Sequence, residues 1–283
     1  MTKKLIVNAD DFGRHSYINA AVRQGVEQGL IRSATVMVTG EAFQEAVDIA
    51  KTHPELGLGI HFTLVNGKPV LPIREIPSLI DPKTGEFFPS HKEFVKQYLS
   101  GKVRRSDVKK ECKAQLEAFL ATGLRPTHAD SHQHMHVLPG IIDIILSLCE
   151  GCGVKRVRIP AIPVSLLATR KSNLGEQVGR MGLHLLAERA QSKAKARGFL
   201  TPDYFGGIVA GEAVDLSNFR TILLQLQEGT TEVMLHPGTD NAVLQPAIQW
   251  DHDFEAELTA VTAPQNLDLV KSQGISVINF TDL

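Results

Sequence analysis

The sequence predicts a (β/α) barrel, in which parallel strands form the core and helices lie outside. Short apolar segments alternate with longer amphipathic segments about seven times along the chain, which is typical of repeated strand–helix units. Polar residues follow several of the apolar segments. A (β/α) barrel assembles its site from the carboxyl ends of several strands, whereas an open doubly wound sheet uses one switch point. The distribution of polar residues therefore favours the barrel.

The individual elements follow from the same alternation. We expect strands at residues 4–8, 34–38, 58–64, 126–131, 154–159, 232–236 and 275–280. Helical periodicity predicts helices at 18–30, 42–51, 107–120, 141–149, 174–195, 219–226 and 254–270, the last one broken at Pro264. Two proline-containing segments, 66–89 and 160–173, interrupt this rhythm. Long insertions beside a barrel strand are usually binding loops, so we expect substrate to pass under residues 66–89.

Length and composition describe one enzyme-sized domain spanning residues 1–283. The chain is 43% hydrophobic, which is enough for a large core, and its net charge of -1 offers no basic surface for nucleic acid or for membrane lipids. The first apolar run is too short for a signal peptide, so we expect a cytoplasmic protein. A possible homodimer is the common default for soluble enzymes. Neither GxGxxG nor a P-loop occurs, which argues against a nucleotide cofactor.

One stretch of the chain carries four histidines and an aspartate at alternating positions: His128, Asp130, His132, His134 and His136. In an extended strand, alternate side chains leave the same face, so these five would line one wall of a site. Neutral imidazole and carboxylate are good ligands for Zn²⁺ and other first-row ions. The stretch predicts a metal site rather than a surface tract, because a tag would not interleave Asp, Ser and Met in mid-chain.

Two adjacent carboxylates and a further histidine lie at other predicted strand ends. Asp10 and Asp11 follow the first apolar run, and Gly13 permits a tight turn that can direct a carboxylate towards the barrel axis. One carboxylate can ligate a metal while the other takes a proton from water, although helix capping is an alternative for one of them. His61 lies in an apolar context, and the histidine-rich strand favours a ligand over a buried structural histidine there.

His236 and Arg158 also close predicted strands. An imidazole opposite the metal can protonate a departing amine, which amide hydrolysis requires. A guanidinium can hold a free carboxylate ionised and oriented through a bidentate pair. A plain structural salt bridge is an equally good interpretation of Arg158.

Four motifs occur in order along the chain: Asn-Ala-Asp-Asp-Phe-Gly at 8–13, Gly-Ile-His-Phe at 59–62, Thr-His-Ala-Asp-Ser-His-Gln-His-Met-His at 127–136 and His-Pro at 236–237. Together they resemble the YdjC-like (ChbG-type) carbohydrate deacetylases over the whole chain. The resemblance implies a NodB-like distorted (β/α) barrel of about seven parallel strands, similar to a TIM barrel. It also implies removal of N-acetyl groups from sugars such as chitooligosaccharides.

The same resemblance implies roles for individual residues. A divalent metal, Mg²⁺ or alternatively Zn²⁺, would be held by Asp11, His61 and His132. Asp10 would be the catalytic base, oriented by Arg158, and a late-strand histidine would be the acid, which His236 resembles.

We therefore expect metal-dependent hydrolysis of an N-acetylated carbohydrate with release of acetate. Asp130 is expected to order a ligand imidazole through a hydrogen bond, and His134 and His136 to lie past the strand end, facing substrate or solvent. Another metal-dependent hydrolase, either a phosphoesterase or a cyclic amidohydrolase, is the alternative, although a phosphatase would usually need a second metal. A non-catalytic metal-binding protein would not require the division of labour between Asp10 and Asp11.

Overall fold

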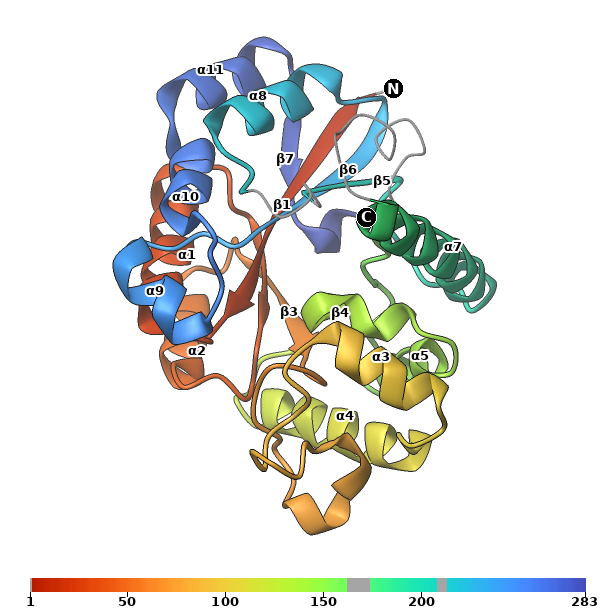
Figure 1. The fold of residues 1–283 in the computed structure, drawn as a ribbon. Coiled ribbons are helices and arrows are strands. Elements are labelled where there is room, and N and C mark those ends of the chain that lie inside the picture. The colour runs from red at the N-terminus through yellow and green to blue at the C-terminus, as the bar shows by residue number, and fades with distance from the viewer. Residues whose placement is uncertain (1, 162–173, 208–212) are drawn as a thin grey trace.

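The chain forms a parallel β-sheet that curls into a half-barrel with helices packed around it (Figure 1). The structure is a computed structural model that describes residues 2–161, 174–207 and 213–283. Within them the strands are β1 (Lys3–Phe12), β2 (Ser33–Val36), β3 (Gly57–Phe62), β4 (Ala129–Ser131), β5 (Tyr204–Gly206), β6 (Gly229–Leu235) and β7 (Ser276–Ile278). They run in the order β4-β3-β2-β1-β6-β5, and every pairing is parallel. The predicted α/β barrel of about seven parallel strands is confirmed.

Strand β1 is the centre of the sheet. One of its edges pairs with β6 from Lys3 to Ala9, and the other pairs first with β7 and then with β2. Its residues from Leu5 onward are buried, as expected for a strand covered on both faces. The end of β1 therefore lies at the middle of the carboxyl edge of the sheet, where the neighbouring strands β2, β3 and β6 also end.

The helices cover the outside of the sheet (Figure 1). They are α1 (Ser16–Gln28), α2 (Phe43–Thr52), α3 (His91–Leu99), α4 (Arg105–Leu120), α5 (Ile141–Gly151), α7 (Leu174–Ala196), α8 (Leu216–Gln225), α9 (Asn241–Ile248), α10 (Phe254–Thr262) and α11 (Pro264–Ser272). The break expected at Pro264 separates α10 from α11, because proline at the first helical position starts a helix but cannot continue one. None of the helices described is long and apolar enough to cross a membrane.

Four elements differ from the sequence prediction. Residues 154–159 form no regular strand and contribute only the isolated bridges Ala129↔Val157 and Arg156↔Leu200. The short strand β5 and the helices α3 and α9 were not expected. Strand β5 has three residues and α9 contains Pro246, so neither gives a clear periodic signal. The expected loop at 160–173 lies, from residue 162 onward, outside the described residues.

The proline-containing segment 66–89 contributes a few of its side chains to the hydrophobic core. It forms two 3₁₀ turns, Ile73–Glu75 and Pro77–Leu79, and buries the side chains of Ile76, Leu79 and Phe87. The buried carboxylate of Glu111 in α4 accepts the backbone N–H groups of Val70 and Leu71 at 2.8 and 3.1 Å. A segment anchored by these contacts is a fixed wall beside the strand ends.

We predict that Glu111→Ala destabilises the protein by about 2 kcal/mol, because the two partly buried N–H groups lose their acceptor. Hydrogen exchange at Val70 and Leu71 should accelerate by a larger factor than exchange in β1. Glu117→Ala on the same helix is the control, since Glu117 is exposed and makes only a surface pair with Lys113. Equal stability of the two variants would contradict this prediction.

Candidate metal centre and active site

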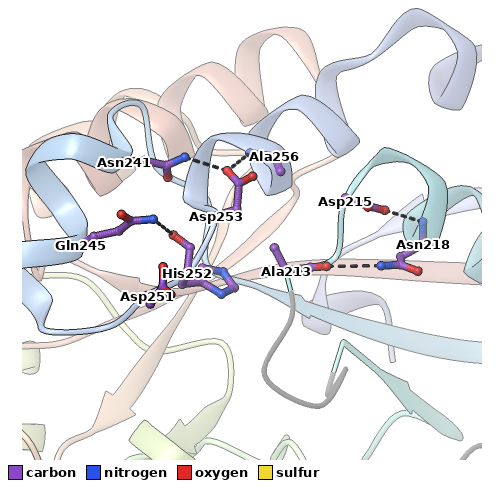
Figure 2. Close-up of a pocket in the computed structure, with 9 residues that line it drawn as sticks. All are labelled: Ala213, Asp215, Asn218, Asn241, Gln245, Asp251, His252, Asp253 and Ala256. Carbon is purple, nitrogen blue, oxygen red and sulfur yellow. Dashed lines mark hydrogen bonds between the residues drawn. The ribbon is translucent and has the colours of Figure 1, made fainter. Parts of the chain in front are cut away.

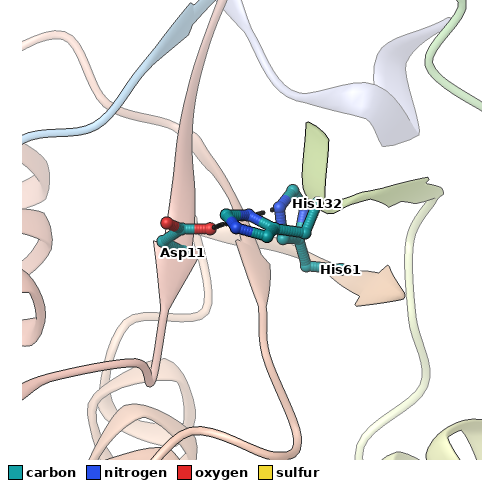
Figure 3. A group of neighbouring side chains, drawn as sticks. All are labelled: Asp11, His61 and His132. Atoms are coloured by element: carbon teal, nitrogen blue, oxygen red, sulfur yellow. Dashed lines mark ion pairs between the residues drawn. The ribbon is translucent and has the colours of Figure 1, made fainter. Parts of the chain in front are cut away.

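Asp11, His61 and His132 come together at the carboxyl ends of three strands (Figure 3). Asp11 lies in β1, His61 in β3, and His132 directly follows β4. The Oδ1 atom of Asp11 lies 2.9 Å from His132 Nδ1 and 3.3 Å from His61 Nε2. All three side chains are buried, so a small ion would be largely shielded from solvent.

The backbone of β1 places both adjacent aspartates at this site. In a regular strand, neighbouring side chains point to opposite faces. Here the register between β1 and β2 shifts between Ala9 and Phe12, and Asp11 has a φ of 59°. Gly13, with a φ of 85°, continues the turn as expected from the sequence. The irregular backbone at Asp11 therefore brings Asp10 and Asp11 to the same end of the barrel.

Two atoms that face each other in this trio, Asp11 Oδ1 and His61 Nε2, are buried without hydrogen-bond partners. On His132 the buried atom without a partner is Nε2, whereas Nδ1 is the ring nitrogen that faces Asp11 Oδ1. Asp130 Oδ1 lies 2.7 Å from His61 Nδ1, so Nδ1 donates to it and Nε2 is the ring nitrogen that faces Asp11 and would bind an ion after losing its proton. This is the contact expected of Asp130. Buried polar atoms normally have partners, so the three fit a site for a divalent cation.

The charges around the trio also suit a cation. Burial by itself raises the pKa of Asp11, but His132 and Arg14 lower it well below the ordinary value, so Asp11 is ionised. Burial lowers the pKa of His61, but Asp130 and Asp11 outweigh it and raise that pKa to about 10. Arg14 Nη1 donates to Asp11 Oδ2 at 2.7 Å and leaves Oδ1 for the site. The negative charges of Asp11 and Asp130 therefore favour a positive charge between these side chains.

Two other groups of possible ligands occur in the described part of the chain, and each is already engaged. In the group of Asp10, His61 and Asp130, both carboxylates are paired with Arg158. In the group of His236, His252 and Glu257, the Glu257 carboxylate accepts the backbone N–H groups of Val214 and His236. The group of Asp11, His61 and His132 is therefore the best candidate metal centre.

Arg158 is fully buried and binds carboxylates next to the candidate metal centre. Its two terminal nitrogens each lie 2.6 Å from one oxygen of Asp10, which is the bidentate geometry expected from the sequence. The same guanidinium contacts Asp130 Oδ2 at 2.6 Å and Glu232 Oε1 at 2.6 Å. Asp10 also accepts from Asn8 Nδ2 at 2.8 Å, so its orientation is fixed by several donors.

Sequence reasoning assigned no role to Glu232, which lies inside β6. A glutamate in the segment Gly-Thr-Thr-Glu-Val-Met-Leu is the signal that was available, since an isolated charge in a buried strand needs a partner. Burial raises the pKa of Glu232 to about 7, and the nearby Asp10 and Asp130 add to this effect, whereas Arg158 opposes it.

His236 directly follows β6 and is half-buried. Its ring packs edge-on against Trp250 and His252, with centroid distances of 5.0 and 5.7 Å. Burial lowers its pKa, although Asp10 and Asp11 oppose this. Since Asp10 and Asp11 act on its charge, His236 lies in the electrostatic field of the same centre.

The histidine-rich stretch does not line one wall, which corrects the sequence interpretation. Strand β4 ends at Ser131, and residues His132–Val137 form a 3₁₀ turn with positive φ at Gln133 and His134. His128 instead stacks on Phe280 with centroids 3.7 Å apart. The turn breaks the alternation, so that only His132 joins the metal centre.

The remaining histidines of this stretch have other neighbours. His136 is buried between the Ser131 hydroxyl at 2.7 Å and the Arg158 carbonyl at 2.9 Å, so it supports the backbone that carries Arg158. It therefore does not face substrate or solvent as expected. His134 is half-buried, and its ring lies edge-on to Phe205, with a centroid distance of 5.9 Å.

A cavity of about 440 Å³ lies near His252, between α8, α9 and α10 (Figure 2). Its polar side chains mostly bind one another or cap helices. Asp215 accepts from Asn218 N, Asp253 accepts from Ala256 N and from Asn241 Nδ2, and Gln245 donates to the His252 carbonyl. These contacts give most of the polar side chains of the cavity a role in holding the helices and loops together.

The fold and the site together define an α/β barrel protein with a candidate divalent metal centre at the carboxyl ends of its strands. The chain belongs to the YdjC-like protein family, whose sequence model matches residues 4–272. It is 31% identical over 283 residues to a carbohydrate deacetylase of Geobacillus stearothermophilus, covering 100% of this chain and 98% of that protein. It is 28% identical over 291 residues to a chitooligosaccharide deacetylase of Serratia marcescens, covering both chains completely.

A solved structure is similar over its whole length as well. It is that of a candidate cellobiose-phosphate cleavage protein from Enterococcus faecalis V583. The two structures superpose with a TM-score of 0.73 at 25% identity, covering 100% of this chain and 99% of the other.

We predict that His61→Ala and His132→Ala each lose bound metal while the fold survives, because the barrel core does not depend on the ion. Metal stoichiometry and circular dichroism of the purified variants measure the two effects. His53→Ala, which changes the histidine that caps the C-terminal end of the outer helix α2, is the control and should keep the wild-type metal content. Full metal occupancy in either site variant would show that the trio is wrong.

We predict that Glu232 makes the metal-free protein less stable as the pH rises from about 4.5 to about 7. In this range the folded protein holds a proton that the unfolded chain has released, so unfolding becomes easier as the pH rises. Glu232→Gln keeps an acceptor for Arg158 and should flatten the dependence. Urea unfolding at several pH values measures it, with Glu255→Gln at an exposed position as the control. An unchanged slope in Glu232→Gln would refute the assignment.

Proposed function

We propose that this protein is a metal-dependent carbohydrate deacetylase that hydrolyses the acetamide of N-acetylated sugars of the chitooligosaccharide type. The observation that carries the proposal is the buried trio of Asp11, His61 and His132, which holds unpartnered ligand-type atoms next to a carboxylate bound by a buried arginine. The full-length similarity to relatives named carbohydrate or chitooligosaccharide deacetylase supports the substrate class.

Asp11, His61 and His132 would hold the cation. When bound, a divalent ion supplies Lewis-acid polarisation of the acetyl carbonyl and makes a water molecule more acidic. The family resemblance implies Mg²⁺, and the two imidazoles of the trio are equally suited to Zn²⁺.

Asp10 is proposed as the base that takes the proton from the attacking water. It is adjacent to the proposed ligand Asp11, and Arg158 donates to both of its oxygens, which fixes its orientation. Arg158 is a positioning residue in this scheme. His236 is proposed as the acid that protonates the departing sugar amine, because it is half-buried, directly follows β6 beside the end of β1, and lies where the Asp10 and Asp11 carboxylates oppose the lowering of its pKa by burial.

Three further parts of the proposal concern the whole molecule. We treat residues 1–283 as one domain, since one cluster of buried apolar side chains extends from β1 to α11. The short first apolar run supports a cytoplasmic location. A homodimer is proposed because it is the common state of soluble enzymes. Three free cysteines are consistent with a reducing compartment.

The test is acetate release by the metal-loaded protein from N-acetylglucosamine and from its β-1,4-linked di- and trisaccharides. We expect Asp10→Asn to keep its metal and to lose turnover by about 10²-fold or more, as for a lost general base. Asp11→Asn should instead weaken metal binding itself.

Metal analysis of both aspartate variants separates the two roles. Equal metal loss in both would make them joint ligands, and the base would have to be another residue. Release of phosphate from simple phosphoesters, with no acetate from any acetylated sugar, would replace the proposal by the phosphoesterase alternative.

A further inference from the structure

A second cavity, of about 300 Å³, lies between the segment 66–89 and the end of α9. Two of the residues that line this cavity, Arg14 and Gln249, connect it to the proposed active site. Arg14 lines it and donates to the proposed metal ligand Asp11 at 2.7 Å. Gln249 also lines it and precedes Trp250 in the chain, whose ring centroid lies 5.0 Å from that of His236. The cavity is thus flanked by residues that contact the proposed metal ligand and the proposed acid.

The lining of this cavity combines amide groups with apolar surface. Asn66 and Gln249 offer amides, Thr84 a hydroxyl and Glu86 a carboxylate, while Phe87, Pro89 and Ile248 are apolar. A sugar ring presents hydroxyl groups around its edge and C–H groups on its faces, which this mixture matches. The Arg14 charge is already balanced by Asp11, so the cavity has no unpaired cation that would demand an anionic ligand.

Unfavourable backbone angles occur both at the proposed metal centre and at this cavity. In the described part of the chain, five non-glycine residues have positive φ: Asp11, Asn66, Gln133, His134 and Gln249. Asp11 is a proposed ligand, and Gln133 and His134 directly follow the proposed ligand His132. The other two line this cavity. Positive φ is unfavourable for residues with a side chain and clusters at functional sites.

Gln249 is the more informative of the two. It ends α9 in the left-handed conformation, with a φ of 55°. Glycine occupies such a position at lower cost, and the cap uses only the backbone N–H of Gln249. The glutamine side chain therefore has no function in capping the helix, and it lies at the cavity.

We propose that this cavity binds the neutral sugar unit adjacent to the one that carries the acetamide, and that Asn66 and Gln249 contact its hydroxyl groups. The inference rests on the proposed function, since the acetamide would lie between the metal centre and His236. The cavity then makes the protein prefer oligosaccharides to a single sugar.

Calorimetric binding tests this proposal without relying on turnover. The parent is the metal-loaded Asp10→Asn protein, which is expected to leave the sugar intact, and the ligands are N-acetylglucosamine and its β-1,4-linked trisaccharide. Asn66→Gly and Gln249→Gly remove each amide at a backbone angle that glycine adopts without strain, so both variants should fold. Gln273→Gly makes the same change at the exposed end of α11 and is the control.

We expect the parent to bind the trisaccharide more tightly than the monosaccharide. Each cavity variant should weaken trisaccharide binding by about two- to tenfold, the range for one lost hydrogen bond, and leave monosaccharide binding unchanged. The control should change neither. The proposal is overturned if the parent binds both sugars equally, if it binds neither, or if trisaccharide binding is unchanged in both cavity variants.

The two proposals fail in different ways. Cavity-dependent binding without acetate release would refute the deacetylase reaction and leave the sugar site. Acetate release with cavity variants that bind like the parent would refute the sugar site alone.

Discussion

The buried guanidinium of Arg158 is the interaction on which the interior of the barrel depends. It contacts Asp10 from β1, Asp130 from β4 and Glu232 from β6, so it joins three strands across the sheet. One cation faces three carboxylates, and the excess negative charge is relieved by the raised pKa of Glu232 and by the contact of Asp130 with His61. Removal of a partner from such a group is costly because the remaining charges stay buried. The proposed base and the proposed metal centre thus share one electrostatic support.

This arrangement explains why two adjacent aspartates can have different roles. Arg158 engages both oxygens of Asp10, whereas Arg14 engages only one oxygen of Asp11. The free oxygen of Asp11 faces two imidazoles, while Asp10 has no oxygen without a donor. The difference arises from the neighbouring arginines, since the two side chains are chemically identical.

The histidine-rich stretch shows how one turn distributes similar side chains among different functions. His128 packs on Phe280, His132 faces Asp11, and His136 holds the Arg158 backbone. The two positive φ angles at Gln133 and His134 separate the direction of His136 from that of His132. An alternating pattern predicts a shared face only while the backbone remains extended, and here the strand ends at Ser131.

The alternation of strand and helix periods along the chain was enough to predict the parallel α/β barrel, and the family resemblance of the sequence motifs implied Asp11, His61 and His132 as the ligand set. The sequence also indicated that Arg158 could hold a carboxylate. The tertiary structure alone decided that Glu232 joins this group, that residues 154–159 contribute only isolated bridges, and that segment 66–89 is a fixed wall with buried side chains. Periodicity reports local burial, whereas these features depend on contacts between residues far apart in the chain and on φ angles that no local pattern specifies.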